Sequence, residues 1–136
     1  GISILNANRN SLILIDSDKR NQQQRINDTK KRIKDEFVDR DAICWITKGK
    51  EIENYILPEA VESQWSIQAN GVFGQYNSFF DDLDKIIDGE GTRYSKKKTL
   101  LAEIMIPHMT RANLFPILHL DDDMNRTCRA IECWNS

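Results

Sequence analysis

The sequence has few of the residues that mark secreted, zinc-binding or membrane-spanning proteins. It has three cysteines among 136 residues, and none of them form a Cys-x-x-Cys pair. An odd number of thiols without such a pair disfavours a disulfide framework and a zinc site, and it favours a reduced, cytoplasmic setting. We find no signal-peptide pattern and no apolar run long enough to span a bilayer, and we therefore expect no membrane partner.

The sequence also has no strong charge of one sign. The formal net charge is −2, with 29% charged and 40% hydrophobic residues. This composition is typical of a globular domain with its own core. No global basic field draws such a chain to nucleic acid, so any contact with nucleic acid must come from local basic patches. A Gly-x-x-x-x-Gly-Lys-Ser/Thr phosphate loop is absent as well, which excludes ATP binding of that kind by this chain.

The most informative segment is a short apolar run that leads into two carboxylates. Residues 12–15 read Leu-Ile-Leu-Ile and predict a buried strand. Asp16 and Asp18 follow, and residues two apart in a strand face the same side. Because open α/β sheets place their chemistry at the carboxyl ends of strands, both aspartates could bind one Mg²⁺ or Mn²⁺ ion. The alternative is that the two aspartates cap the helix that follows.

A strand–helix–strand unit is predicted around this segment. Ile26, Ile33 and Phe37 share one face of a helix, whose other face is basic and reads as solvent-facing. Residues 42–47 then predict a second buried strand, which would run parallel to the first. The fold class is therefore α/β, with a parallel sheet core flanked by helices.

Two more acids follow the second strand. Glu51 and Glu53 lie two residues apart, and an extended backbone would aim both in one direction. Parallel strands end at the same edge of a sheet, so these glutamates could meet Asp16 and Asp18. Four converging carboxylates would repel one another unless a divalent cation lay among them. The alternative is a surface network in which both glutamates pair with Lys48, Lys50 or an arginine.

The second half of the chain predicts helices. Residues 79–87 predict a helix with an apolar stripe on one face. The opposite face would be exposed to solvent and would carry four aspartates (Asp81, Asp82, Asp84 and Asp88). A basic patch follows, which could meet a nucleic-acid backbone or could be a solvated helix start (Arg93, Lys96, Lys97 and Lys98). Residues 121–123 are aspartates that suit the start of a last helix, whose apolar face would contain Met124, Cys128, Ile131 and Trp134. We divide the chain into a partial α/β core over 1–64 and a mostly helical part over 65–136 that packs on it.

These motifs resemble the Toprim domain of ATPase-linked nucleases. The segments that carry the resemblance are Asp16-Ser17-Asp18 after an apolar strand, and Gly49-Lys50-Glu51-Ile52-Glu53-Asn54-Tyr55 followed by Leu57-Pro58. The family is that of the "overcoming lysogenisation defect" endonucleases and their relatives in bacterial anti-phage defence. The resemblance covers residues 11–62 well and continues weakly through residues 98–102 and the terminal helix.

The resemblance implies a metal-dependent DNA endonuclease. Asp16 and Asp18 would be the metal-binding pair, with Glu53, and also Glu51, as the later acids. Lys98 fits the lysine that often accompanies such a site, with Lys97 next. The cofactor would be Mg²⁺ or Mn²⁺. The implied partners are DNA, an ATPase domain on the same polypeptide, and further copies of the full-length chain in a homo-oligomer.

One element of the family pattern is missing from this sequence. Toprim domains carry an earlier glutamate on or after their first strand, and residues 1–10 contain no acid. We therefore expect the first strand, the helix after it and this glutamate to lie upstream, together with the ATPase region, and we expect an incomplete active site here. Two other interpretations stay open. The first is a non-catalytic protein-interaction module with a degenerate Toprim-like fold. The second is a receiver-like domain, which also binds Mg²⁺ through an aspartate pair.

Overall fold

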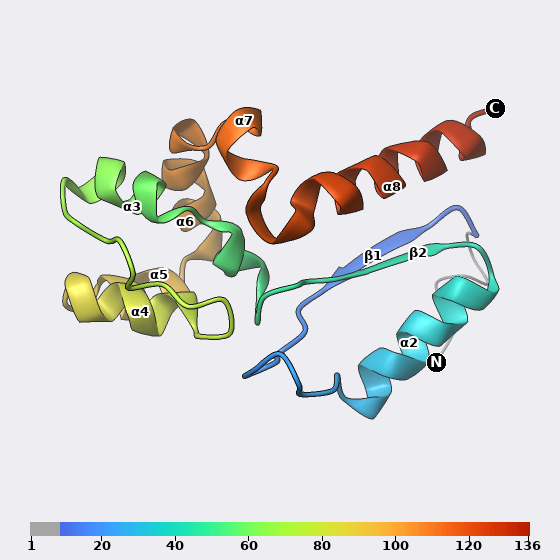
Figure 1. The fold of residues 1–136 in the computed structure, drawn as a ribbon, viewed down its shortest axis with the longest axis horizontal. Helices are drawn as coiled ribbons and strands as arrows, with labels where there is room; N and C mark the ends of the chain where they lie inside the picture. Colours follow the sequence, from blue (N-terminus) through green and yellow to red (C-terminus); the bar gives the residue numbers. More distant parts are fainter. Residues whose placement is uncertain (1–8) are drawn as a thin grey trace.

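A computed structural model describes residues 9–136, which form a small parallel sheet and a series of helices (Figure 1). A strand–helix–strand unit and the last helix lie at one end of the molecule, and the helices between them lie at the other. The result is a mixed α/β structure with a helical C-terminal part, as the sequence predicts. The elements are β1 (Leu12–Ile15), α2 (Asp28–Asp39), β2 (Ile43–Ile46), the 3₁₀ helix η1 (Ile52–Tyr55), α3 (Pro58–Trp65), α4 (Phe79–Ile86), α5 (Glu90–Ser95), α6 (Lys98–Met105), η2 (Ile106–His108), α7 (Arg111–Leu114), η3 (Ile117–His119) and α8 (Leu120–Trp134).

The two strands pair in parallel, which confirms the predicted strand–helix–strand unit. Leu12 lies opposite Ile43, and Ile15 lies opposite Ile46. Helix α2 covers one face of the sheet, where Ile33 and Phe37 pack against side chains of both strands. Ile26, which we expected on the same helical face, precedes α2 instead, because the Asn27 side chain accepts a hydrogen bond from the Lys30 N–H and begins the helix there.

Strand β1 is less buried than its sequence predicts. Leu12 and Leu14 are 40% and 42% exposed, whereas their partners Ile43 and Trp45 are 7% and 8% exposed. All four side chains share the face of the sheet opposite α2, and Leu120 at the start of α8 packs on Trp45. Helix α8 thus covers β2 and leaves the β1 half of this face open within residues 9–136. The prediction of a strand buried on both faces is wrong for β1.

The helical end of the molecule has its own core. Leu57 and Val61 pack there with side chains of α4 and α6 in the largest apolar cluster of the described residues. Helix α4 confirms the apolar stripe predicted over residues 79–87. Asp82 corrects the prediction of a wet opposite face, because it is only 1% exposed and accepts hydrogen bonds from the Gly74 N–H and the Lys85 ammonium. A buried carboxylate is stable only with such partners.

The last helix is anchored at its start and exposed at its end. Asp121, Asp122 and Asp123 occupy the first turn of α8, as predicted, and Asp123 is buried against Lys48 at 2.7 Å. Cys128 and Ile131 are exposed, so the predicted apolar face of α8 is only partly covered by the described residues. No helix within residues 9–136 is both long and apolar enough to span a membrane.

The segments that leave β1 and β2 are tied together by buried hydrogen bonds. The Ser17 N–H donates to Thr47 Oγ1 at 3.0 Å, and Ser17 Oγ donates to the Gly49 carbonyl at 2.6 Å. The Asp18 N–H donates to the Lys50 carbonyl at 2.8 Å, which continues the pairing beyond the strands. A side chain at Gly49 would collide with Asn54 and Gln75, so the Gly49 backbone lies close to both residues. These bonds hold Asp16 beside the start of η1.

Replacing Ser17 with alanine should weaken the fold. The change Ser17→Ala removes a buried donor to Gly49 and leaves that carbonyl with fewer hydrogen bonds, which should lower the free energy of unfolding by about 1–3 kcal/mol. Urea titration followed by circular dichroism measures this loss. Ser95→Ala is the control, because the exposed Ser95 hydroxyl bonds only within its own helix, to Thr92. Equal stability of the two variants would contradict the role given to Ser17.

Candidate functional site

Asp16 lies where the two strand ends meet. Its Oδ1 accepts a hydrogen bond from the Ile52 N–H at 2.8 Å, at the first residue of η1. The carboxylate therefore sits against the segment that carries Glu51 and Glu53. The expectation that acids following the two strands approach one another is met by Asp16 and η1, because the hydrogen bonds of Ser17 and Asp18 hold the two segments side by side.

Asp18 points to a different partner. Strand β1 ends at Ile15, and Asp18 has a left-handed backbone with φ 55°, so the strand geometry that would align Asp16 with Asp18 does not apply. The Asp18 carboxylate forms an ion pair with the Lys30 ammonium, which also donates to the Asp16 carbonyl at 2.6 Å. The prediction that the two aspartates face one way is wrong, and their shared role as metal ligands stays a prediction.

Lys30 is a site residue that the sequence interpretation missed. It belongs to the basic run of α2 that reads as solvent-facing, yet its side chain is only 18% exposed because it reaches back to the loop after β1. Its spacing of three and seven residues before Ile33 and Phe37 puts it on the face of α2 that meets the sheet, and this is the signal that distinguishes it from Lys31 and Arg32.

Glu51 and Glu53 diverge rather than share one direction. Glu51 is the extended residue before η1, and its Oε1 accepts a hydrogen bond from the Phe79 N–H at 2.9 Å. Glu53 lies inside the 3₁₀ helix and turns toward α6. The predicted extended backbone over both glutamates is wrong, because η1 begins between them. Glu51 thus holds the start of α4, and Glu53 is the acid available to the site.

Lys98, the first residue of α6, pairs with Glu53 of η1. Lys98 Nζ lies 3.1 Å from Glu53 Oε1, and their side chains are 54% and 9% exposed. Burial acts to lower the pKa of Lys98, but the hydrogen bond and charge of Glu53, with smaller effects of Glu51 and Asp16, raise it above its ordinary value. Lys98 is therefore a stable cation, and these four side chains form one electrostatic cluster, called here the acid–lysine cluster.

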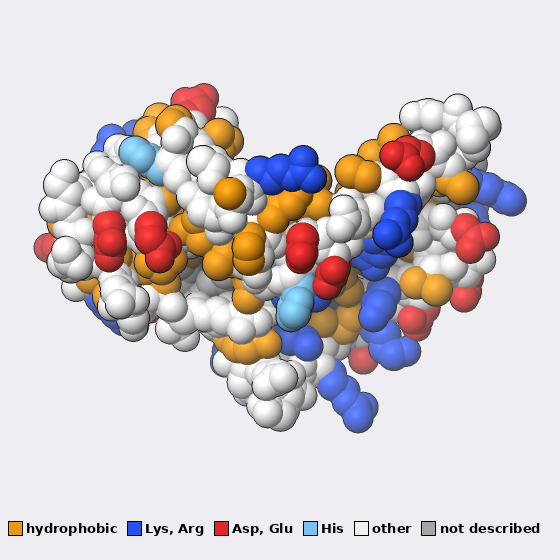
Figure 2. Space-filling view, turned by 45° about the horizontal axis from the view of Figure 1, so that its top comes forward, with side chains coloured by type: hydrophobic (Ala, Val, Ile, Leu, Met, Phe, Trp, Pro, Cys, Tyr) orange, Lys and Arg blue, Asp and Glu red, His pale blue; other side chains and the backbone are white. Residues whose placement is uncertain are grey.

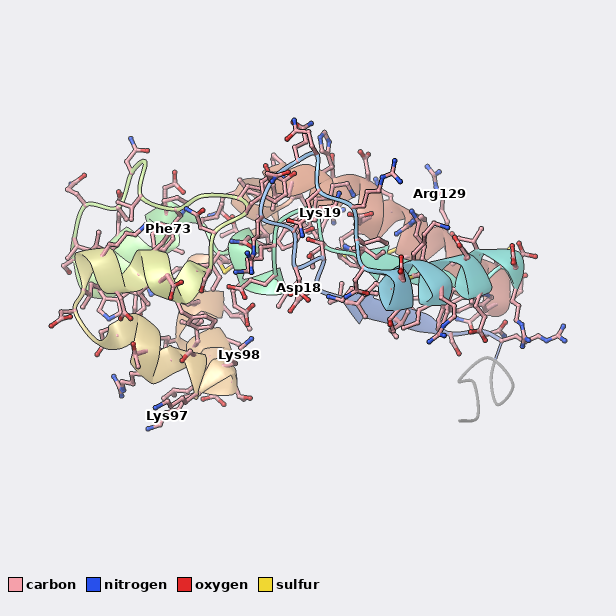
Figure 3. The ribbon with its side chains drawn as sticks, turned by 90° about the horizontal axis from the view of Figure 1, so that it is seen from below. Asp18, Lys19, Phe73, Lys97, Lys98 and Arg129 are labelled. Atoms are coloured by element: carbon pink, nitrogen blue, oxygen red, sulfur yellow. The ribbon has the colours of Figure 1, made fainter. Side chains whose placement is uncertain are left out.

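The neighbouring basic residues do not join this cluster. Lys97 precedes α6 and lies away from Lys98 in Figure 3, where Lys98 points toward the middle of the molecule. Lys96 is exposed, and Arg93 pairs with Glu90 at 3.3 Å on its own helix. Of the basic patch that the sequence shows over residues 93–98, the structure brings only Lys98 to the acids.

One oxygen of Glu53 lacks a hydrogen-bond partner. Glu53 Oε2 is buried and accepts no hydrogen bond in the part of the chain that the structure describes. A buried carboxylate oxygen without a donor is costly, and a cation would satisfy it. Over residues 9–136, no three acidic, histidine or cysteine side chains already form a metal-binding group. Mg²⁺ commonly uses one or two carboxylates and keeps several waters, so Glu53 and Asp16 suit it as a partial ligand set.

A basic groove lies beside the strand ends. Its volume is about 1260 Å³ and it runs between the 19–34 segment, the end of β2 and Tyr76. The cations that line it are Lys19, Arg25, Lys31, Lys34 and Lys48, and two acids, Asp28 and Asp35, line it as well. Two of them are paired with acids, Lys31 with Asp35 and Lys48 with Asp123. Figure 2 shows lysine and arginine side chains gathered over this half of the molecule. The groove therefore offers a path for an anionic chain.

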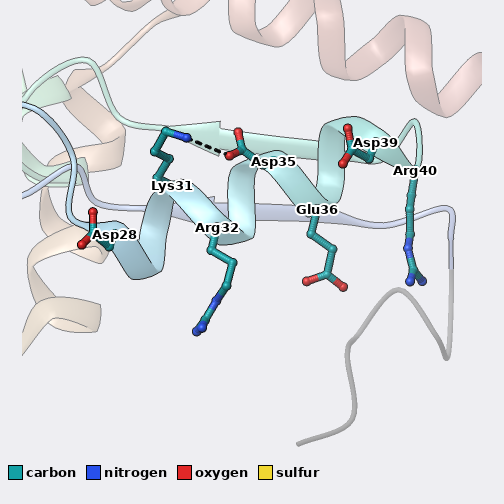
Figure 4. Close-up of a pocket in the computed structure, with 7 residues that line it drawn as sticks. All are labelled: Asp28, Lys31, Arg32, Asp35, Glu36, Asp39 and Arg40. Carbon is teal, nitrogen blue, oxygen red and sulfur yellow. Dashed lines mark hydrogen bonds and ion pairs between the residues drawn. The ribbon is translucent and has the colours of Figure 1, made fainter.

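The outer face of α2 differs from this groove. Figure 4 shows side chains of both signs along the helix, among them Lys31 paired with Asp35 at 3.1 Å. Its lining holds three basic and four acidic residues, so the face has no charge of one sign to select a ligand. It fits the solvated helix face that the sequence predicts, and the site is the acid–lysine cluster.

Comparison with known proteins finds no family model, no curated protein and no solved structure that matches this chain. The interpretation of the site therefore depends on its own geometry and charges.

The pKa of Glu51 leads to a prediction about stability. Burial raises this pKa, the charge of Glu53 adds to the rise, and the bond from Phe79 opposes it. The folded state therefore binds the Glu51 proton more tightly than the unfolded state, and Glu51 costs stability as the pH rises above about 4. Glu51→Gln keeps an acceptor for Phe79 without the charge. We expect this variant to melt at a higher temperature than the wild type at pH 7 and to lose that advantage near pH 3.

Thermal unfolding of both proteins from pH 3 to pH 8 measures this difference. Glu103→Gln serves as the control, because Glu103 is an exposed acid on α6 and its removal should shift the curve little. A melting temperature of Glu51→Gln that stays below that of the wild type at pH 7 would show that the Glu51 charge stabilises the fold.

Proposed function

We propose that this chain is the Toprim-like, metal-binding part of a cytoplasmic, ATPase-linked DNA endonuclease that hydrolyses phosphodiester bonds, in a role such as phage defence. The observation that carries the proposal is the Lys98–Glu53 pair at 3.1 Å, with a buried Glu53 oxygen left over and Asp16 held beside the same 3₁₀ helix. A half-exposed lysine paired with a buried acid, beside further acids at the carboxyl ends of parallel strands, suits phosphoryl chemistry.

Each residue of the acid–lysine cluster has a distinct role in this proposal. Glu53 and Asp16 would hold a Mg²⁺ or Mn²⁺ ion, whereas Glu51 holds the start of α4 through Phe79, and Asp18 outside the cluster pairs with Lys30. Such an ion polarises a phosphate oxygen and lowers the pKa of a bound water. Lys98 keeps Glu53 in place and offers a positive charge to the anion that develops on the phosphate. Because Lys98 is half exposed, a substrate can reach it.

The basic groove supports DNA as the partner. It lies at the ends of the same two strands, and Lys19 and Lys48 come directly from the segments that leave β1 and β2. A DNA backbone in this groove would meet lysine and arginine side chains on its way to the strand ends. Tyr76 in the groove wall offers a flat surface on which a base could stack.

A protein-interaction module is the second candidate, and the open half of the sheet favours it. Leu12 and Leu14 are exposed on β1, whose outer edge pairs with no strand within residues 9–136. Parallel sheets are usually covered on both faces, so a further element could pack there. A non-catalytic module of this kind would need neither the acids nor Lys98.

Metal binding tests the roles of Glu53 and Asp16. We expect the isolated chain to bind Mn²⁺ weakly and to show the strongest paramagnetic broadening at the amides of residues 16 and 53. Glu53→Gln and Asp16→Asn should each weaken binding by about tenfold, because each removes one charged ligand. Glu103→Gln, which removes an exposed acid from α6, should bind like the wild type. Equal Mn²⁺ binding by Glu53→Gln and the wild type would remove Glu53 from the site.

Cleavage tests the role of Lys98. In the ATPase-linked protein, Lys98→Met should lower the rate of DNA cleavage by about 100-fold and change DNA affinity little, because the lysine acts on charge that develops in the transition state. Lys97→Met is the matched control, since Lys97 lies one residue away and points elsewhere. ATP hydrolysis should stay unchanged in both variants. Equal cleavage rates for the two variants would contradict the nuclease assignment of this site.

A further inference from the structure

A largely apolar cavity opens next to the acid–lysine cluster. It has a volume of about 610 Å³ and lies between η1, α6 and the segment that leads to α8. Tyr55, Leu101, Met105 and Leu114 line it, and apolar side chains show in the middle of the face in Figure 2. A cavity of this size and lining is typical of sites for small organic molecules.

The cavity has one polar end, formed by Glu53 and Lys98. Both residues line it, and they pair through Glu53 Oε1. Glu53 Oε2 is buried without a hydrogen-bond partner among the described residues, and the Glu53 side chain is 9% exposed. The apolar walls supply no donor for this oxygen. A molecule in the cavity could therefore satisfy it with an N–H or O–H group.

The charges at this end select the sign of the ligand. Asp16, Glu51 and Glu53 carry three negative charges, against the positive charges of Lys98 and of Lys50 beside Glu51. The remaining negative charge attracts a cation and repels a carboxylate. A charged N–H donor also forms a stronger hydrogen bond with a carboxylate than a neutral donor does.

We propose that this cavity binds an amphipathic organic cation, with an ammonium group donating to Glu53 Oε2 and an aliphatic or aromatic body among Leu101, Met105 and Leu114. This site goes beyond the proposed nuclease function and shares only the acid–lysine cluster with it. Since the organic cation and a divalent metal ion would satisfy the same oxygen, occupation of the cavity would oppose metal binding at Glu53.

The probe for this site is n-hexylammonium, compared with n-hexanol and n-hexanoate in buffer that contains a chelator. Titration calorimetry and amide chemical shifts should show saturable binding of n-hexylammonium, with shifts at residues that line the cavity. Binding of n-hexanoate should be at least about tenfold weaker, because the same chain then carries a charge that the acids repel. No saturable binding of n-hexylammonium, or equal binding of n-hexanoate, would overturn the proposal.

Two variants test separately the part of the site that holds the apolar body of the ligand and the part that holds its ammonium group. Ala102 lines the cavity on an exposed turn of α6, so Ala102→Phe should fill the space and reduce n-hexylammonium binding by about tenfold or more. Ala112→Phe is the matched control, because Ala112 is exposed on α7 and does not line the cavity. Glu53→Gln should remove the preference for n-hexylammonium over n-hexanol. Wild-type binding by Ala102→Phe, or an unchanged preference in Glu53→Gln, would contradict the proposed site.

Measuring metal binding as well distinguishes failure of the cavity proposal from failure of the proposed metal site. Ala102→Phe should bind Mn²⁺ like the wild type, whereas Asp16→Asn should lose Mn²⁺ affinity and lose only a small part of its n-hexylammonium affinity, because Asp16 contributes charge but does not line the cavity. Binding of Mn²⁺ without n-hexylammonium would overturn the cavity proposal alone, and binding of n-hexylammonium without Mn²⁺ would overturn the metal site alone.

Discussion

The site depends on the buried hydrogen bonds that join the segments after β1 and β2. Ser17 and Thr47 are each 3% exposed, and their hydroxyls bond to backbone groups of the opposite or same segment. Such bonds are strong in a dry environment and costly to break. They take the place of the backbone hydrogen bonds between strands at the point where the two segments leave the sheet.

This constraint determines which acids can act together. It holds Asp16 against the first residue of η1, and η1 in turn directs Glu53 toward Lys98. Asp18, only two residues from Asp16, is directed to Lys30 by its left-handed backbone. Asp16, Asp18, Glu51 and Glu53 each have at least one donor, and Glu53 Oε2 is buried without one among the described residues. Glu53 also lines the apolar cavity, which is why both proposals use this oxygen.

The helical half contributes to the site through one residue. Helix α6 begins directly at Lys98, and its apolar side chains, such as Leu101 and Met105, pack in the core of that half. The core thereby fixes the backbone from which Lys98 extends, and the ion pair with Glu53 holds its ammonium group. Lys98 differs from Lys96 and Lys97 in this respect, although the three are chemically identical. A charge that is held in place interacts with a partner without the entropic cost of ordering a long side chain.

The sequence by itself determined the strand–helix–strand order, the apolar stripe of α4 and the acidic start of α8. Apolar runs predicted β1 and β2, and apolar periodicity predicted α2 and α4, because strands and helices bury their side chains at different spacings. The positions of Asp16, Asp18, Glu51 and Glu53 after the two strands made them candidates, and the resemblance to Toprim domains added Lys98. Tertiary structure decided which faces are covered, as the exposed Leu14 and the buried Asp82 show. It also decided where each acid points, since the end of β1 at Ile15 and the 3₁₀ turn at Ile52 depend on contacts between segments far apart in the chain. Periodicity is a local property, whereas burial and pairing are set by neighbours that the local sequence does not contain.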